Sequence, residues 1–330
     1  MNMNTFISAQ DRISGALWGS VVGDALGVPV EFQSRQSLRD NPVTTMRGFG
    51  TYGQPPGTWS DDSSLLLCTV DSLATCGRFD VNDLADRFVR WGVDGYCTPH
   101  GNIFDIGIAT SEAIANLGNG VPPEQAGRAD EYSNGNGSLM RILPIALWFL
   151  TSTSEELMVA PQRASCLTHR HPRSQMACAL YCLLVRALIQ GLPPEEAWQQ
   201  SVERFAAFYQ RAPYARERLH FRLIESGKLA DQTELNIDSS GYVMHTLAAA
   251  VWCLLTSRSF EETMLKAVNL GGDTDTTGCV AGGLAGACYG IASIPADWKS
   301  VLARCSDIES LFTRFLDQLP MLSIESKPIN

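Results

Sequence analysis

The sequence contains ten cysteines but no Cys-x-x-Cys pair. Structural zinc sites and small disulfide frameworks need cysteines at short, paired spacings, so neither kind of site is indicated. The cysteines fall singly in apolar segments, and Cys178 and Cys182 are spaced as a pair facing the core on one helix. We therefore expect free, mostly buried thiols in a reducing compartment.

Other features are missing as well. The first dozen residues lack the basic and apolar regions of a secretion signal. No uninterrupted apolar run approaches the roughly 20 residues that a membrane span requires. Lysine and arginine are scattered and the formal net charge is −10, so a nucleic-acid-binding surface is not indicated. The sequence predicts a cytoplasmic protein without nucleic-acid or membrane partners.

Alternating strand patterns are also lacking, and the apolar periodicity is helical nearly throughout. Apolar residues from Val81 to Val89 recur at i, i+3, i+4, i+7 and i+8, which forms one stripe on a helix. Further helices are predicted over about 12–28, 63–76, 103–117, 138–151, 173–190, 194–210, 241–256, 259–270, 276–291 and 297–318. These patterns predict an all-α protein of ten or more helices.

No stretch has the composition of an interdomain linker. Apolar residues make up 45% and charged residues 18% of the chain, which is an ordinary globular balance. We expect one domain over residues 13–320, a flexible extension over 1–12, a short tail over 321–330, and a monomer.

The first predicted helix carries a glycine at every fourth position, at Gly15, Gly19, Gly23 and Gly27. Each glycine inside a helix costs about 1 kcal/mol relative to alanine, so a compensating contact is needed. Close packing of another helix is one interpretation. Approach of a ligand is the other, and the nearby Asp24 and Glu31 favour it.

Two short acidic motifs combine carboxylates with hydroxyls beside apolar helices. The first contains Ser60, Asp61 and Asp62 in "GTWSDDSS", and the second contains Asp273, Asp275 and Thr276 in "GGDTDTTG". Each motif alone could simply cap a helix. Four carboxylates brought together would repel one another unless cations neutralised them. Because all the ligands are oxygens, the pattern favours Mg²⁺ or Mn²⁺, with two ions sharing a carboxylate.

Three familiar acidic-motif families do not fit. An EF-hand loop starting at Asp273 would need glutamate at its twelfth position, where Leu284 stands. An isoprenoid-diphosphate enzyme would need a further aspartate where Leu65 follows "DDSS". A helical phosphohydrolase would need a His-Asp dipeptide, which the sequence lacks.

A glycine-rich loop suggests an anion site. Residues 134–138, "NGNGS", precede a predicted helix, and exposed N–H groups at a helix start can bind phosphate. His169 precedes another helix, where it could bind a ligand or cap the helix. Asp105 is either a buried structural partner or a group facing the substrate, and Tyr242 either stacks on a base or belongs to the core.

With these motifs in place, the sequence resembles the ADP-ribosylglycohydrolase family, of the type that activates dinitrogenase reductase. The resemblance runs through "GALWGSVVGDALGVPVEF", "GTWSDDS", "GNIFDIGIAT", "NGNGSLMRILPIA", "LTHRHP", "SGYV" and "GGDTDTTGCVAGGLAGACYG". It implies an all-α orthogonal bundle with a binuclear Mg²⁺ or Mn²⁺ centre that cleaves the bond at C1″ of ADP-ribose.

The resemblance also implies roles for individual residues. The metal ligands would be Ser60, Asp61, Asp62, Asp273, Asp275 and Thr276, with Ser60 where the family more often has threonine. The substrate-binding residues would be Asn102, Asn134, Gly135, Asn136, Gly137, Ser138, Met140, His169 and Tyr242. Glu31 would be the leading general acid or base, with Asp62 and Asp105 as rivals.

The implied substrate is a protein carrying mono-ADP-ribose, most readily on arginine, and the product is ADP-ribose. Such an enzyme would reverse an ADP-ribosyltransferase and could serve as an immunity factor against a transferase toxin. Serine-linked or small-molecule conjugates are alternative substrates. A non-catalytic ADP-ribose-binding protein is another alternative, and an isoprenoid-diphosphate enzyme is the least favoured.

Overall fold

The computed structural model describes residues 7–211 and 213–319. Within these ranges there are helices and loops but no strand, and two isolated β-bridges join Arg128 to His169 and Gly135 to Tyr242. The prediction of an all-α protein is confirmed.

The α-helices are α1 (Ala9–Gly27), α2 (Arg35–Asp40), α3 (Asp61–Cys76), α4 (Val81–Asp94), α5 (Ile108–Gly118), α6 (Pro123–Ala126), α7 (Leu143–Trp148), α8 (Ser154–Cys166), α9 (Pro172–Ile189), α10 (Pro194–Phe208), α11 (Tyr214–Glu217), α12 (Arg222–Glu225), α13 (Val243–Leu255), α14 (Phe260–Val268), α15 (Thr274–Tyr289), α16 (Ala296–Ser300) and α17 (Cys305–Gln318). In the described part of the chain, short 3-10 helices accompany them: η1 (Val28–Val30), η2 (Arg218–Phe221), η3 (Glu234–Asn236) and η4 (Ile291–Ser293).

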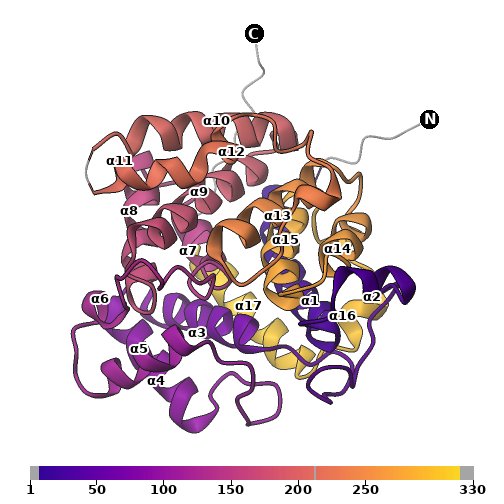
Figure 1. Cartoon of the computed structure of the whole chain (residues 1–330). Helices are drawn as coiled ribbons and strands as arrows, with labels where there is room; N and C mark the ends of the chain where they lie inside the picture. Colours follow the sequence, from indigo (N-terminus) through magenta and orange to yellow (C-terminus); the bar gives the residue numbers. More distant parts are fainter. Residues whose placement is uncertain (1–6, 212, 320–330) are drawn as a thin grey trace.

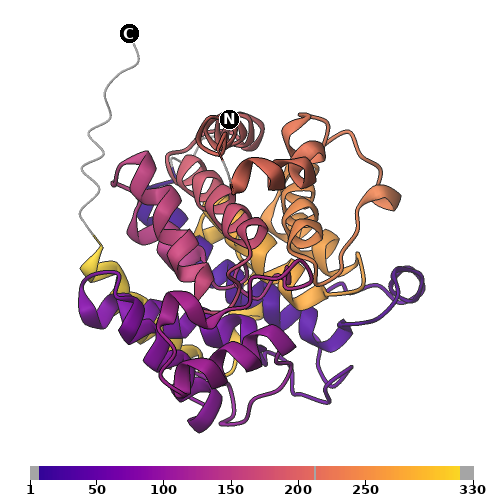
Figure 2. The same ribbon diagram turned by 60° about the vertical axis from the view of Figure 1, so that its left-hand side comes forward.

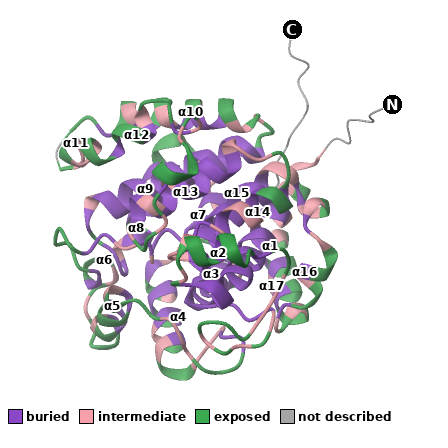
Figure 3. Ribbon diagram, turned by 45° about the vertical axis from the view of Figure 1, so that its right-hand side comes forward, coloured by how far each residue is buried: buried purple, intermediate pink, exposed green. Residues whose placement is uncertain are grey.

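The first and the fifteenth helices form the centre of the molecule. Helices α1 and α15 lie side by side, although they come from opposite ends of the sequence (Figure 1). Helices α3–α6 lie at one end of the molecule and α10–α12 at the other (Figures 1 and 2). Burial follows this arrangement, because α1, α9 and α15 are almost wholly buried, whereas α2 and α10 present exposed faces (Figure 3).

The glycines of α1 allow this central contact. A Cβ atom added at Gly15, Gly19 or Gly23 would overlap the backbone carbonyl oxygen of Gly286, Gly282 or Gly278 on α15 respectively. The overlap is reciprocal, because a Cβ atom on any of these α15 glycines would meet the carbonyl of its α1 partner. The two helices therefore touch backbone to backbone, and the packing interpretation of the glycine pattern is confirmed.

Helix α1 also accounts for an apparent membrane signal. By length and composition, Ala9–Val30 could cross a membrane, contrary to our expectation from the sequence. However, 94% of its most apolar window is buried inside the protein. Its packing against α15 gives it the place of a core helix.

Several predicted helix boundaries were wrong. Helix α1 begins at Ala9, before the predicted start at about residue 12, so it includes residues 9–12 of the expected extension. Residues 1–6 and the predicted tail lie outside the described ranges, and the domain limits stay a prediction. The helix predicted over 138–151 shrinks to α7. The helix predicted over 297–318 is two helices, because Arg304 adopts a left-handed backbone conformation between α16 and α17. Helix α8 was not predicted.

The central contact can be tested by substituting one of its glycines. We expect Gly282→Ala to lower the free energy of unfolding by about 2–3 kcal/mol or more, because the added methyl group would push α15 away from α1. Urea unfolding followed by circular dichroism would measure the change.

Gly118→Ala is a matched control at the end of α5. A Cβ atom there meets only Val89 Cγ1, at 4.0 Å, so the helix should be unaffected or slightly stabilised. Equal stability of Gly282→Ala and wild type would contradict the observed contact.

Candidate active site

The two acidic motifs occupy the N-termini of two helices that meet. Ser60 is the N-cap of α3, and its Oγ accepts a hydrogen bond from the Asp62 amide at 3.2 Å. Asp273 is the N-cap of α15, and Thr276 lies in its first turn. Thr276 Oγ1 donates to Asp62 Oδ1 at 3.2 Å, which joins the two motifs directly. Both helix dipoles favour negative charge at this point.

Asp24, which the sequence linked to a possible ligand site without a specific role, fixes the first motif in place. Its carboxylate lies on α1, is fully buried, and accepts hydrogen bonds from the backbone amides of Ser60 and Ser63 at 2.9–3.2 Å. The Ser63 hydroxyl donates a further bond at 2.5 Å. Asp24 therefore caps α3 from a neighbouring helix. The one signal in the sequence was a lone acid within a glycine-rich apolar helix.

The carboxylates gather in two overlapping groups. Oxygen atoms of Asp24, Asp62 and Asp275 lie within 4.8 Å of one another, and so do those of Glu31, Asp273 and Asp275. Asp275 belongs to both groups, so its carboxylate stands where it could bridge two ions.

Unpaired oxygen atoms test whether cations fit this centre. Among the described residues, buried side-chain oxygens without a hydrogen-bond partner include one atom each of Glu31, Asp62, Asp273 and Asp275. Buried polar atoms are normally paired, and carboxylate oxygens are the ligands that hard divalent cations prefer. The centre therefore fits one or more such cations.

Burial raises the proton affinity of this cluster when no cation is present. It raises the pKa of Asp61, Asp62 and Asp275 well above the ordinary value, and neighbouring carboxylates add to the effect. Burial also raises the pKa of Asp24 to about 6, although hydrogen bonds from Ser60 and Ser63 oppose the shift. For Glu31, burial and then the charge of Asp105 raise the pKa to about 9.

Glu31 and Asp105 approach the centre from two different loops. Glu31 is buried and follows η1, and its backbone carbonyl accepts a bond from Thr51 Oγ1 at 2.6 Å. Asp105 precedes α5 in a left-handed conformation with φ 53°, which is uncommon for residues other than glycine. Tyr52 lies beside both acids. Burial, and then hydrogen bonding to Asp105 and Glu31, raises the pKa of its phenol above the ordinary value.

The glycine-rich loop packs over His169. A Cβ atom at Gly137 would lie 2.8 Å from His169 Cε1 and 3.0 Å from Thr110 Oγ1, so only glycine fits there. His169 is buried, and burial lowers its pKa to about 3, so the imidazole is neutral. Asn136 Nδ2 donates to Asp273 Oδ2 at 2.9 Å, which ties the loop to the second acidic motif.

A cavity of about 490 Å³ joins the acidic centre to this loop. The predicted site residues that line it are Glu31, Asp61, Asp62, Asp105, Gly135, Asn136, Gly137, Met140, His169, Asp273 and Thr276. Ser60 and Asp275 lie behind this lining, buried in the acidic centre. The cavity also contains Arg128 and Thr110, which the sequence analysis did not single out.

Four predicted substrate-binding residues are not part of the lining. Asn102 is exposed. The Ser138 hydroxyl is buried and hydrogen-bonded to Ser165 at 2.8 Å, so this side chain points into the core and not at a phosphate. Asn134 donates its amide to Glu131 O, and the Tyr242 hydroxyl accepts a bond from Arg173.

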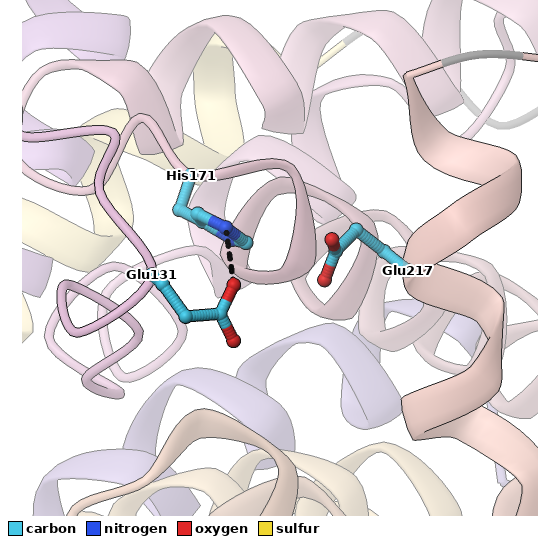
Figure 4. Close-up of side chains that lie close together, drawn as sticks. All are labelled: Glu131, His171 and Glu217. Atoms are coloured by element: carbon cyan, nitrogen blue, oxygen red, sulfur yellow. Dashed lines mark ion pairs between the residues drawn. The ribbon is translucent and has the colours of Figure 1, made fainter.

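A third acidic group lies beside the loop. Glu131, His171 and Glu217 converge, with His171 Nε2 3.5 Å from Glu131 (Figure 4). Arg173 Nη2 lies 2.8 Å from a carboxylate oxygen of both Glu131 and Glu217. Because a guanidinium already neutralises these acids, the group is a structural tie between the loop and α11, and not a metal centre.

Comparison with known proteins agrees with this geometry. The model of the ADP-ribosylglycohydrolase family matches residues 6–323. The chain belongs to the ADP-ribosylglycohydrolase family. The resemblance drawn from its motifs is therefore confirmed, and family membership supports a hydrolase.

Relatives and a solved structure cover most of this ADP-ribosylglycohydrolase family member. The ADP-ribosylarginine hydrolase Tri1 of Pseudomonas putida (strain GB-1) is 32% identical over 315 residues, which span 95% of this chain and 80% of the relative. The ADP-ribosyl-[dinitrogen reductase] glycohydrolase of Rhodospirillum rubrum is 31% identical over 299 residues, which span 89% of this chain and 91% of the relative. A structure described as an ADP-ribosylglycohydrolase-related protein complex is 34% identical, with a TM-score of 0.80. The match covers 95% of this chain and 99% of the chain in that structure.

The raised pKa values predict how pH affects stability in this member of the family. Acids that hold protons more tightly in the folded protein stabilise it below their unfolded pKa, and this contribution is lost as pH rises through the folded values, about 6 for Asp24 and about 9 for Glu31. In EDTA, the melting temperature should therefore fall between about pH 5.5 and pH 8. Excess Mg²⁺ should raise it by several degrees at the higher pH.

Two variants separate Mg²⁺ binding at this centre from the general effect of removing one negative charge. Asp275→Asn should reduce the Mg²⁺-dependent shift in melting temperature, because Asp275 belongs to both carboxylate groups. Asp86→Asn, an exposed substitution on α4, should keep the full shift. Equal melting temperatures in EDTA and Mg²⁺ at about pH 8 would show that the centre binds no cation.

The anchoring role of Asp24 predicts a separate loss of stability. In excess Mg²⁺, Asp24→Asn should lower the free energy of unfolding by about 2–3 kcal/mol, because hydrogen bonds to a charged acceptor are replaced by weaker ones. Urea unfolding would measure the loss, again with Asp86→Asn as control. An unchanged urea midpoint would show that α3 does not depend on this cap.

Proposed function

We propose that this family member hydrolyses the bond between ADP-ribose and arginine side chains of modified proteins, with the help of two divalent cations. The observation that carries the proposal is the single cavity in which buried carboxylates with unpaired oxygens face a glycine-rich loop. Its volume of about 490 Å³ lies within the ordinary range for small-molecule sites. The names of the relatives from Pseudomonas putida and Rhodospirillum rubrum support the same class of reaction.

The cation ligands are inferred from the family motifs. Ser60, Asp61, Asp62, Asp273, Asp275 and Thr276 would hold two Mg²⁺ or Mn²⁺ ions. Of these, Asp62, Asp273 and Asp275 belong to the two carboxylate groups, which also include Asp24 and Glu31. When bound, such ions offset the repulsion between carboxylates, orient sugar hydroxyls and favour ionisation of a water molecule.

The remaining acids of the cavity would handle protons. Hydrolysis breaks the bond from C1″ to the guanidino nitrogen and forms a bond from C1″ to a water oxygen, so a proton leaves the water and one reaches the nitrogen. Glu31 is the leading candidate, because it lines the cavity beside Asp105 and one of its oxygens has no hydrogen-bond partner. Asp105, beside it, is the alternative, and Asp62 is tied to Thr276.

The charge of the cavity favours an arginine linkage. Among the described residues that line it, Arg128 carries positive charge, whereas five residues are acidic. Arg128 is already paired with Glu112 and Asp130. If cations neutralise the acidic motifs, the Asp105 carboxylate in the lining still attracts a guanidinium, which a serine hydroxyl cannot match.

The biological setting follows from the same proposal. An enzyme that removes ADP-ribose acts against an ADP-ribosyltransferase, either a regulator in the same cell or a toxin to which this protein confers immunity. We place the protein in the cytoplasm, in keeping with its ten free cysteines.

The decisive assay measures release of ADP-ribose from a protein mono-ADP-ribosylated on arginine. Release should require Mg²⁺ and stop in EDTA. Asp61→Ala should lower the rate at least about 100-fold, because it removes one oxygen ligand of the centre. A serine-linked substrate should react more slowly.

Glu31→Gln tests the proton-transfer role. The amide keeps the size of the side chain but cannot exchange protons, so kcat should fall about 100-fold or more. Asp86→Asn should retain wild-type activity. If ADP-ribose binds tightly but neither linkage is cleaved, the protein is a binder of ADP-ribose and the proposed function is wrong.

A further inference from the structure

Two phenylalanines combine an unfavourable backbone with an exposed side chain: Phe32 lines the cavity, and Phe49 lies on the loop whose Thr51 hydroxyl donates to the Glu31 carbonyl. Phe32 has φ 62° and is 68% exposed, and Phe49 has φ 71° and is 65% exposed. Positive φ is a genuine outlier for a bulky residue, and such outliers persist mainly at sites of function. A side chain exposed to water makes few stabilising contacts in the isolated protein, so it does little to offset this backbone strain. Contact with another molecule would offset it.

Two more exposed apolar side chains lie on the segment that follows Asp105. Ile106 and Ile108, on either side of Gly107, are 38% and 77% exposed. Phe32 and Ile108 lie at the rim of the cavity, and Ile106 follows Asp105 directly. We refer to Phe32, Phe49, Ile106 and Ile108 as the mouth surface.

Hydrogen bonds hold the mouth surface in position. The Phe32 amide donates to Gly272 O at 2.7 Å, and the Gly272 amide donates to Gln33 O at 2.9 Å, beside the second acidic motif. The loop that carries Phe49 is tied to the same region, because the Thr51 amide donates to Pro29 O at 3.1 Å. A preformed apolar surface loses little conformational freedom on binding.

The reach of the substrate side chain identifies the occupant. This step rests on the proposed function, in which the cleaved bond lies beside Glu31 and Asp105. An arginine side chain is short, so the polypeptide that carries it must lie against the rim of the cavity. Phe32 and Ile108 line this end of the cavity, Ile106 directly follows Asp105, and the loop that carries Phe49 is bonded to the Glu31 carbonyl through Thr51.

We propose that the mouth surface docks the polypeptide that flanks the modified arginine, by contact with exposed apolar side chains of that polypeptide. The surface thereby selects among proteins that carry the same ADP-ribosyl group. It contributes to the KM for protein substrates and not to the cleavage step.

Asparagine substitutions test the surface without disturbing the backbone. Asparagine tolerates positive φ better than phenylalanine, so Phe49→Asn and Phe32→Asn should fold normally. Phe49→Asn should lower kcat/KM for an arginine-ADP-ribosylated protein about tenfold, through KM, because aromatic side chains dominate interface energies. Hydrolysis of ADP-ribosylarginine as the free amino acid conjugate should stay within about twofold of wild type. Val93→Asn on α4, a residue 75% exposed, is the matched control.

The outcomes are distinguishable. A loss confined to the protein substrate in Phe49→Asn, and deepened in the double variant with Phe32→Asn, supports docking. An equal loss on both substrates, or no loss on either, overturns it. So does a wild-type dimer that Phe49→Asn dissociates in size-exclusion chromatography, because the occupant is then a second copy. Failure of the wild type to cleave either substrate overturns the proposed function itself, and the docking proposal with it.

Discussion

The backbone contact between α1 and α15 is the constraint on which the rest of the structure depends. Paired glycines let the two helices touch along their length, and the contact continues to the end that carries the chemistry. There, Thr274 Oγ1 donates to Gly27 O at 2.9 Å, which fixes the start of α15 against the end of α1. Asp24 on α1 and Asp275 on α15 are consequently held in one carboxylate group. The helix pair that forms the core therefore also sets the geometry of the site.

The acidic centre lowers the stability of the fold but leaves carboxylate oxygens free to bind a cation or a reacting group. Buried carboxylates repel one another, and burial raises the pKa values of Asp24 and Asp62, for Asp24 against the opposing hydrogen bonds from Ser60 and Ser63. Two helix N-termini and the cap supplied by Asp24 offset part of this cost, but unpaired oxygens remain. Such atoms are a liability in a purely structural cluster, and they are what a cation or a reacting group requires. The family assignment and the unpaired carboxylate oxygens thus both support the interpretation that this centre can bind cations.

Local patterns made much of this structure predictable, and contacts between distant segments limited the rest. The helix pattern and the acidic motifs depend on short spacings, so the sequence revealed them. Helix α8 was not predicted because Pro161 lies inside it and proline is unfavourable within a helix, although Thr153 and Glu156 form a capping box at its start. Pro144 near the start of α7 explains why that helix is shorter than predicted. The inward turn of Ser138 depends on core packing, which one sequence without a fold does not show.

The pairing of α1 with α15 also has a consequence for biosynthesis. The first helix leaves the ribosome long before its partner glycines at positions 278–286 are made, and at about 5–20 residues per second this delay is roughly 15–50 s. During that time a segment apolar enough to resemble a membrane span has no native partner. Folding is thus a late event that joins the two ends of the chain. The native contact that buries this segment can therefore form only when synthesis is nearly complete.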